Sequence, residues 1–172
     1  MKDLFPFAKK RSSKKKAWLD YLFYNLGKQK YNYYLCGLRK TEEKDRISTK
    51  WFKYLEIVAP LNLNEHWRLN NINQRQVLSN EIVLDLEERE NLSKIKTTLL
   101  ERNQKFFVFD THSRGYHINI FFKRKISKKR KEIIINYFQA DLSKANPKTM
   151  IALEFSPHWK SGKIKELVYY HV

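Results

Sequence analysis

Two carboxylates, Asp85 and Glu87, flank Leu86 at the end of the apolar run 82–86 and could carry out chemistry. Residues i and i+2 of a β-strand point to the same face of the sheet, so we expect these side chains to lie next to each other. Two neighbouring carboxylates repel each other unless a cation lies between them, and their hard oxygen atoms suit Mg²⁺ or Mn²⁺. The same pattern also fits an edge strand with a solvated acidic face.

A second candidate is the polar turn at residues 111–117, which reads Thr-His-Ser-Arg-Gly-Tyr-His. Thr111 or Ser113 could donate a hydroxyl hydrogen bond to a phosphate, and Arg114 could clamp an anion with two hydrogen bonds. Gly115 would let the backbone approach a phosphate closely, and His117 begins the next strand. The alternative interpretation is a plain hairpin turn with a structural histidine.

A third candidate is the basic turn at residues 155–163, where His158 and Lys160 could contact phosphates. An ordinary basic hairpin would explain this turn equally well. Asp141 is the acid closest to the end of a predicted helix. A negative charge is unfavourable at a helix C-terminus, so some other interaction is expected to hold Asp141 there.

The charge of the chain favours polyanionic partners. The 172 residues contain 35 Lys and Arg against 18 Asp and Glu, a net charge of +17, which is typical of proteins that bind nucleic acid. Basic residues concentrate at 9–16 and at 123–131, whereas acids concentrate at 81–90. We expect the second basic run to contact nucleic-acid phosphates through Lys123, Arg124, Lys125, Lys128, Lys129 and Arg130.

Other classes of protein are disfavoured by the composition. The single cysteine, Cys36, rules out a disulfide framework and a multi-cysteine zinc site. The chain has no long apolar run for a membrane span and no apolar segment typical of a signal peptide near Met1. We therefore expect an intracellular protein of the cytoplasm or nucleoid, with no membrane partner.

Hydrophobic periodicity predicts an α+β fold. Helices are expected after the capping residues Asn91 and Ser127, the second with Ile133, Ile134, Tyr137 and Phe138 facing inward. Strands are expected at 82–86, 105–110, 116–122, 150–155 and 164–170. The order is β-α-β-β-α-β with one added hairpin strand, which is a ferredoxin-like unit of the kind found in RNA-recognition modules (RRMs).

The pattern divides the chain into three predicted segments. We expect residues 1–16 to be a basic flexible arm, and residues 17–80 to be a mostly helical or irregular extension packed on the core. Residues 81–172 are expected to form the RRM-like module.

The ordered motifs resemble those of the archaeo-eukaryotic primase superfamily, the primase-polymerases. That family combines an acid-x-acid pair, a Ser/Thr-containing turn that ends in His, and a later acid on an RRM-like module. Many members add a His-x-Lys-Ser/Thr-Gly turn, which residues 158–162 match closely. The resemblance covers about residues 75–170 and implies template-directed synthesis or extension of primers from nucleoside triphosphates.

The resemblance also implies roles for individual residues. Asp85, Glu87 and Asp141 would be catalytic and would bind two Mg²⁺ or Mn²⁺ ions, with Glu154 as a rival for the third acid. Nucleotide-binding residues would be Thr111, Ser113, Arg114, His117, His158 and Lys160. Partners would be a single-stranded DNA template and nucleoside triphosphates, with an accessory primase subunit or a helicase. No zinc is expected, so the chain resembles a reduced member of the family.

Two alternatives compete with this interpretation. A non-catalytic RRM-like module could stack single-stranded nucleic acid on the sheet aromatics Phe107, Phe109, Tyr116, Phe121 and Phe122, although ordinary core packing also explains these residues. A rolling-circle initiator nuclease would need a His-hydrophobe-His motif. Residues 117–119 read His-Ile-Asn, so one metal ligand would be missing.

Overall fold

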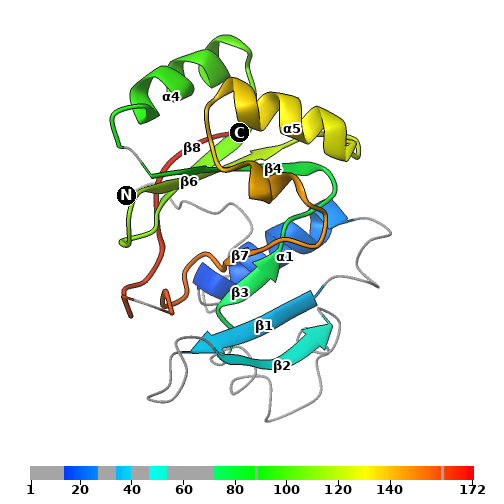
Figure 1. The fold of residues 1–172 in the computed structure, drawn as a ribbon, viewed down its shortest axis with the longest axis vertical. Helices are drawn as coiled ribbons and strands as arrows, with labels where there is room; N and C mark the ends of the chain where they lie inside the picture. Colours follow the sequence, from blue (N-terminus) through cyan, green and yellow to red (C-terminus); the bar gives the residue numbers. More distant parts are fainter. Residues whose placement is uncertain (1–13, 27–33, 40–46, 54–71, 88, 160) are drawn as a thin grey trace.

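A computed structural model describes residues 14–26, 34–39, 47–53, 72–87, 89–159 and 161–172. The fold is α+β, as the sequence predicts. It contains two antiparallel four-stranded sheets with the strand orders β2-β1-β3-β7 and β4-β6-β5-β8. The helices α4 and α5 cover one face of the second sheet, and α1 lies against its other face, on the side of the first sheet (Figure 1).

The second sheet contains the predicted catalytic unit. Its elements follow the predicted order with small changes at their ends. They are β4 (Glu81–Leu86), α4 (Leu92–Glu101), β5 (Phe106–Asp110), β6 (Tyr116–Phe121), α5 (Lys128–Tyr137) and the added strand β8 (Glu166–His171). The adjacent order β4-β6-β5 is that of the first three strands of a ferredoxin-like unit, so the prediction is confirmed for this part.

The fourth strand of the predicted unit lies elsewhere. Strand β7 (Met150–Ala152) pairs with β3 (Gln74–Gln76) and therefore belongs to the first sheet. It ends three residues before the predicted end, and Phe155 has a φ of 57°, which turns the chain away from an extended path. The 3₁₀ helix η2 (Leu142–Ala145) lies next to β4, and the backbone NH of Asp141 lies 3.4 Å from the carbonyl oxygen of Asp85.

The N-terminal part contains more β-structure than predicted. After α1 (Lys14–Leu26) come β1 (Tyr34–Arg39) and β2 (Ile47–Lys53), which form the first sheet with β3 and β7. The prediction of a mostly helical or irregular extension is therefore wrong for these described segments. Strands β1 and β2 pair with each other across a short connection, but β1 pairs with β3 about 40 residues away and β3 pairs with β7 about 75 residues away, and no local pattern reveals these partners.

The basic arm predicted for residues 1–16 ends earlier than expected, because α1 begins at Lys14. Residues 1–13 lie outside the described part of the chain. Lys15 is buried, and its ammonium donates a hydrogen bond to the carbonyl oxygen of Ile72. Burial lowers the pKa of Lys15 to about 8, so at least this cation is part of the packed structure.

Helix α1 closes one face of the second sheet. Trp18 is fully buried and makes edge-to-face contacts with Phe107, Phe109 and Phe121. Tyr116 and Phe122 pack against the other core cluster, beneath α4 and α5. These five aromatic side chains are therefore ordinary core residues. The RRM alternative predicts that they form an exposed base-stacking platform, and that prediction is wrong.

Helix α5 begins as predicted but faces the core differently. The Ser127 hydroxyl accepts a hydrogen bond from the backbone NH of Arg130, so Ser127 is the N-cap. From this start, the helical repeat turns Lys131 and Ile135 inward, and the predicted inward positions Ile133 and Tyr137 are exposed. Of the predicted set, Ile134 and Phe138 are partly buried against the core.

Asn91 occupies the N-cap position of α4, as predicted, but its side chain makes no capping hydrogen bond. Among the described residues, no helix is both long and apolar enough to cross a membrane.

Candidate active site

The site is built at the end of strand β4. Asp85 is the second-last residue of this strand, and the antiparallel register places it opposite His117 of β6. The Nε2 atom of His117 lies 3.3 Å from Oδ1 of Asp85. Pairing of β4 with β6 thus brings the first and second predicted motifs into direct contact.

Asp141 approaches Asp85 from the segment that follows α5. It is the N-cap of η2, and its carboxylate accepts hydrogen bonds from the backbone NH and the hydroxyl of Ser143, at 2.9 and 2.7 Å. These bonds explain why an acid is stable just after α5: Asp141 serves the start of the next helix.

One ammonium joins the two carboxylates. The Nζ atom of Lys144 lies 3.2 Å from Oδ2 of Asp85 and 3.1 Å from Oδ2 of Asp141. Burial raises the pKa of Asp85, but His117 and Lys144 outweigh that effect and hold this pKa well below its usual range. The pKa of Asp141 is also lowered, because Ser143 and Lys144 outweigh the effect of its partial burial. Both groups are therefore carboxylates at neutral pH.

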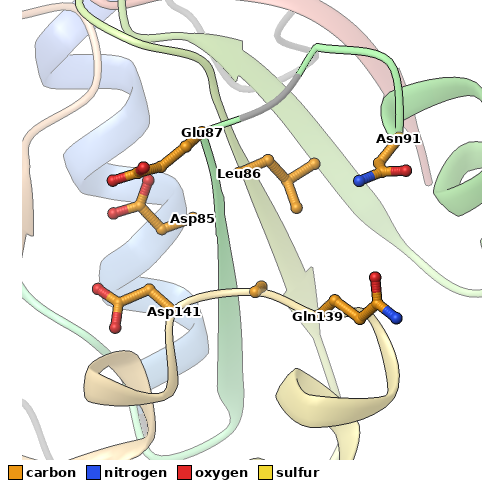
Figure 2. A pocket seen from close by; sticks show the side chains of 7 residues that line it. Asp85, Leu86, Glu87, Asn91, Gln139 and Asp141 are labelled. Atoms are coloured by element: carbon orange, nitrogen blue, oxygen red, sulfur yellow. The ribbon is translucent and has the colours of Figure 1, made fainter.

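Glu87 completes the acidic group but is the most exposed of the three. Its side chain is 74% exposed and lies 3.8 Å from the guanidinium of Arg114. Asp85, Glu87 and Asp141 line one cavity of about 390 Å³, and Figure 2 shows their carboxylates gathered at one side of it, whereas Leu86, Asn91 and Gln139 line the other. The structure thus brings all three predicted catalytic acids to one cavity.

The next question is whether the carboxylates of Asp85, Glu87 and Asp141 are suited to bind a metal ion. Within the described residues, no three His, Cys, Asp or Glu side chains lie close enough together to form a closed metal cluster. The ammonium of Lys144 nevertheless shows that Asp85 and Asp141 hold a cation between them. A Mg²⁺ ion needs only one or two protein carboxylates because it keeps several waters, so the acids fit such an ion.

A second cavity, of about 290 Å³, shares Asp85 and Glu87 with the first. Its other lining residues come mainly from the turn at residues 111–117 and from the basic turn that follows β7: Thr111, Ser113, Arg114, Gly115, His117, Lys144, His158 and Trp159. The predicted nucleotide-binding residues therefore gather beside the acids, except Lys160, which lies outside the described residues. Opposite charges next to each other suit a ligand such as a triphosphate with its cation.

The turn at residues 111–117 differs in detail from the prediction. The hydroxyl of Thr111 donates to the carbonyl oxygen of Gly115 at 2.7 Å, so it supports the turn, whereas Ser113 is exposed. A Cβ atom on Gly115 would lie 1.8 Å from the carbonyl oxygen of Leu86. Glycine is therefore required here for close packing against β4, and Gly115 also lines the second cavity.

Glu154 is not the third acid. It is fully buried, it pairs with Arg75 at 2.7 Å and Lys165 at 2.9 Å, and it accepts a hydrogen bond from the indole NH of Trp18. Burial raises its pKa, but the two cations outweigh that effect, so Glu154 is an ionised core residue.

Two lysines of the site were missed by sequence reasoning. Lys144 lies three residues after Asp141, a spacing that a helical turn brings together, so it could have been found. Lys165 is fully buried, and its Nζ lies 2.9 Å from Nδ1 of His117. Burial and the Lys165 charge lower the pKa of His117 to about 4, although Asp85 and Glu154 oppose this shift. A buried lysine has no local sequence signal.

The predicted nucleic-acid-binding run surrounds the start of α5, whereas the acids lie beyond its end. The ten residues of α5 span about 15 Å; Lys128, Lys129 and Arg130 lie at the start of this helix, whereas Asp141 follows its end. All six predicted residues are exposed.

Known structures support the architecture. The chain is similar to the crystal structure of the catalytic domain of primase RepB' in complex with initiator DNA, with a TM-score of 0.52, 15% identity, and coverage of 87% of this chain and 82% of that chain. A crystal structure of primase RepB' matches with a TM-score of 0.51 and 15% identity, over 90% of this chain and 56% of that one. No protein-family model and no curated protein matches the chain. The chain therefore shares the fold of a primase catalytic domain.

Proposed function

We propose that the protein is a metal-dependent, template-directed nucleotidyltransferase of the primase-polymerase kind, which makes or extends primers from nucleoside triphosphates. One observation carries the proposal. The carboxylates of Asp85 and Asp141 both contact the ammonium of Lys144, beside a cavity lined by basic and hydroxyl side chains. The fold shared with a primase and the ordered motifs of the primase superfamily support the same activity.

The acids would hold Mg²⁺ or Mn²⁺, in a two-metal site formed by Asp85, Glu87 and Asp141. Bound metal would neutralise charge on the phosphates and stabilise the leaving pyrophosphate. In the reaction, a 3′-hydroxyl group loses its proton to water as its oxygen forms a bond to the α-phosphorus, and the bond between that phosphorus and the bridging oxygen of the β-phosphate breaks, which releases pyrophosphate.

The chain's own residues would orient the triphosphate. Arg114 and His158 line the second cavity, where they can bind phosphate oxygens, and Ser113 can donate its hydroxyl. His117 holds Asp85 in place from within the sheet. Lys144 would leave its bridge between the carboxylates when metal binds and would then be free to contact a phosphate.

The template would be single-stranded DNA. The exposed cations of residues 123–130 would bind its phosphates along the start of α5. The structurally similar catalytic domain of primase RepB' was solved in complex with initiator DNA. An accessory primase subunit or a helicase is the further partner we propose.

The test is a primer-synthesis assay on single-stranded DNA with Mg²⁺ or Mn²⁺, together with calorimetric titration of a nucleoside triphosphate. The double variant Asp85→Asn, Glu87→Gln should lose on the order of 10³-fold in rate, because metal assistance is worth several kcal/mol. It should also lose metal-dependent nucleotide binding.

The matched control is Glu101→Gln, an exposed acid at the end of α4, which should act like the wild type. Full activity in the double variant would disprove the proposal. DNA binding by the wild type without any nucleotide incorporation would favour a non-catalytic module.

A further inference from the structure

A buried group of four charges lies behind the active site. The guanidinium of Arg75 binds Glu81 at 2.6 Å and Glu154 at 2.7 Å, and the ammonium of Lys165 binds Glu154 at 2.9 Å. All four side chains are fully buried. Two cations and two anions balance; burial lowers the pKa of Lys165, but the carboxylate of Glu154 opposes this shift and supports the ammonium form of the lysine.

Lys165 has three hydrogen-bond donors and uses each of them. Its Nζ lies 2.9 Å from Oε1 of Glu154, from the carbonyl oxygen of Ala152 and from Nδ1 of His117. An ammonium group can only donate. Nδ1 of His117 must therefore accept, and the proton of the neutral imidazole must be on Nε2.

The Nε2 atom is the one that faces the active site. It lies 3.3 Å from Oδ1 of Asp85, while the other carboxylate oxygen of Asp85 faces Lys144. With the proton on Nε2, the ring donates to the carboxylate. With the proton on Nδ1, a nitrogen lone pair would point at a carboxylate oxygen, and the two would repel.

We propose that Lys165 is a positioning residue, which fixes the tautomer of His117 so that its Nε2–H orients the carboxylate of Asp85. Lys165 touches neither cavity, so it acts through His117. The catalytic consequence of this arrangement rests on the proposed function, whereas the tautomer itself does not. The buried group of Arg75, Glu81, Glu154 and Lys165, whose charges balance, thus supports the active site from behind.

The first experiment measures the tautomer of His117 by ¹⁵N NMR of the side chain at neutral pH, with the signal assigned from His117→Asn. We expect an unprotonated Nδ1 and a protonated Nε2. A proton on Nδ1, or on both nitrogens, would overturn the proposal. This measurement uses the wild-type protein and needs neither metal nor activity.

The second experiment asks which neighbour dictates the tautomer. In Asp85→Asn, the side-chain amide can present either its oxygen or its NH₂ to His117, so it accommodates both tautomers. If Lys165 is the determinant, Nε2 keeps its proton in this variant. A mixture of tautomers in Asp85→Asn would show that the carboxylate sets the proton, and the role of Lys165 would be lost.

The third experiment replaces the lysine. Lys165→Met keeps the length of the side chain but removes the donor, and the exposed Lys105→Met is the control. We expect mixed tautomers when Lys165→Met is combined with Asp85→Asn, because neither neighbour then fixes the proton. In Lys165→Met alone we expect a 10- to 100-fold weaker Mn²⁺ affinity, as for other supporting residues of metal sites, measured by paramagnetic resonance. Unchanged tautomer and affinity would overturn the proposal.

These outcomes separate the two proposals. If the wild type binds no Mn²⁺, the proposed function fails while the tautomer measurement still decides the role of Lys165. If Lys165→Met does not fold, the wild type and Asp85→Asn decide it.

Discussion

The two groups of acids in this protein differ in what surrounds them. Glu154 and Glu81 lie between the two sheets, where every charge has a partner and no atom is exposed. Asp85 and Asp141 lie at the cavity, partly exposed, and share a single lysine. Both groups have carboxylates and cations, so residue type alone does not distinguish them.

The two groups differ in how many hydrogen bonds their carboxylate oxygens already receive. The oxygens of Glu154 receive hydrogen bonds from Arg75, Lys165, Trp18 and Asn119, which leaves no room for another ligand. The oxygens of Asp85 and Asp141 retain free directions toward the cavity. An enclosed acid therefore stabilises the fold, whereas an open one can bind a cation from solution.

The largest effect is expected in the enclosed group. Glu154→Ala should lower the free energy of unfolding by about 3–5 kcal/mol, because it leaves Arg75 and Lys165 buried without their partner. Urea denaturation measures this loss. Glu87→Ala is the matched change in the open group, and it should cost less than about 1 kcal/mol because its ion pair is exposed. Equal losses in both variants would contradict the distinction.

His117 joins the two groups, and its protonation gives an intermediate effect. Its pKa is about 4 in the folded protein against 6.5 for an ordinary histidine. Between these values the unfolded chain binds a proton that the folded protein does not, so stability rises with pH in this window. We expect the free energy of unfolding to fall, by up to about 3 kcal/mol, as the pH is lowered from 6.5 to 4.

Denaturation curves at several pH values measure this dependence, and His117→Asn should flatten it over the same window. Below pH 4, protonation of Asp85 and Glu154 should destabilise the fold further, because their pKa values lie below the usual range in the folded protein. A flat profile between pH 6.5 and 4 in the wild type would contradict the burial of a neutral His117.

Local patterns predicted the parts of the site that depend on local geometry. The i, i+2 spacing of Asp85 and Glu87 and the strand that begins near His117 follow from the two-residue period of a strand, and antiparallel pairing then made Asp85 and His117 neighbours. The position of β7 beside β3 could not be predicted, because it depends on chain segments about 75 residues apart.

Burial of charge was equally invisible in the sequence. Glu154 follows an apolar run just as Asp85 does, and only the three-dimensional positions of Arg75 and Lys165 show that it is a core residue. The inward face of α5 was misassigned for the same reason. A buried Lys131 occupies a position that a hydrophobic pattern assigns to solvent.

The basic run contains the same contrast between enclosed and open charges, on the scale of half a helical turn. Lys131 is buried and donates to the carbonyl oxygen of Leu78 at 2.7 Å, whereas Lys129 is exposed. Only the open lysine can bind a phosphate of a DNA strand. Counting all cations of the run as a binding surface would therefore overstate it.

The smallest predicted effect tests this contrast. Lys129→Ser should weaken the binding of single-stranded DNA about fivefold at 0.1 M salt and reduce the slope of log affinity against log salt by about 0.7, because one phosphate contact releases that much counterion. Its free energy of unfolding should stay within about 0.5 kcal/mol of the wild type. Lys131→Met should do the reverse, losing stability because the Leu78 carbonyl oxygen loses one of its two donors and keeps only the backbone NH of Glu81, while the salt dependence is kept. Fluorescence anisotropy across a salt series measures both variants, and a reduced slope in Lys131→Met would mean that the enclosed lysine opens to bind DNA.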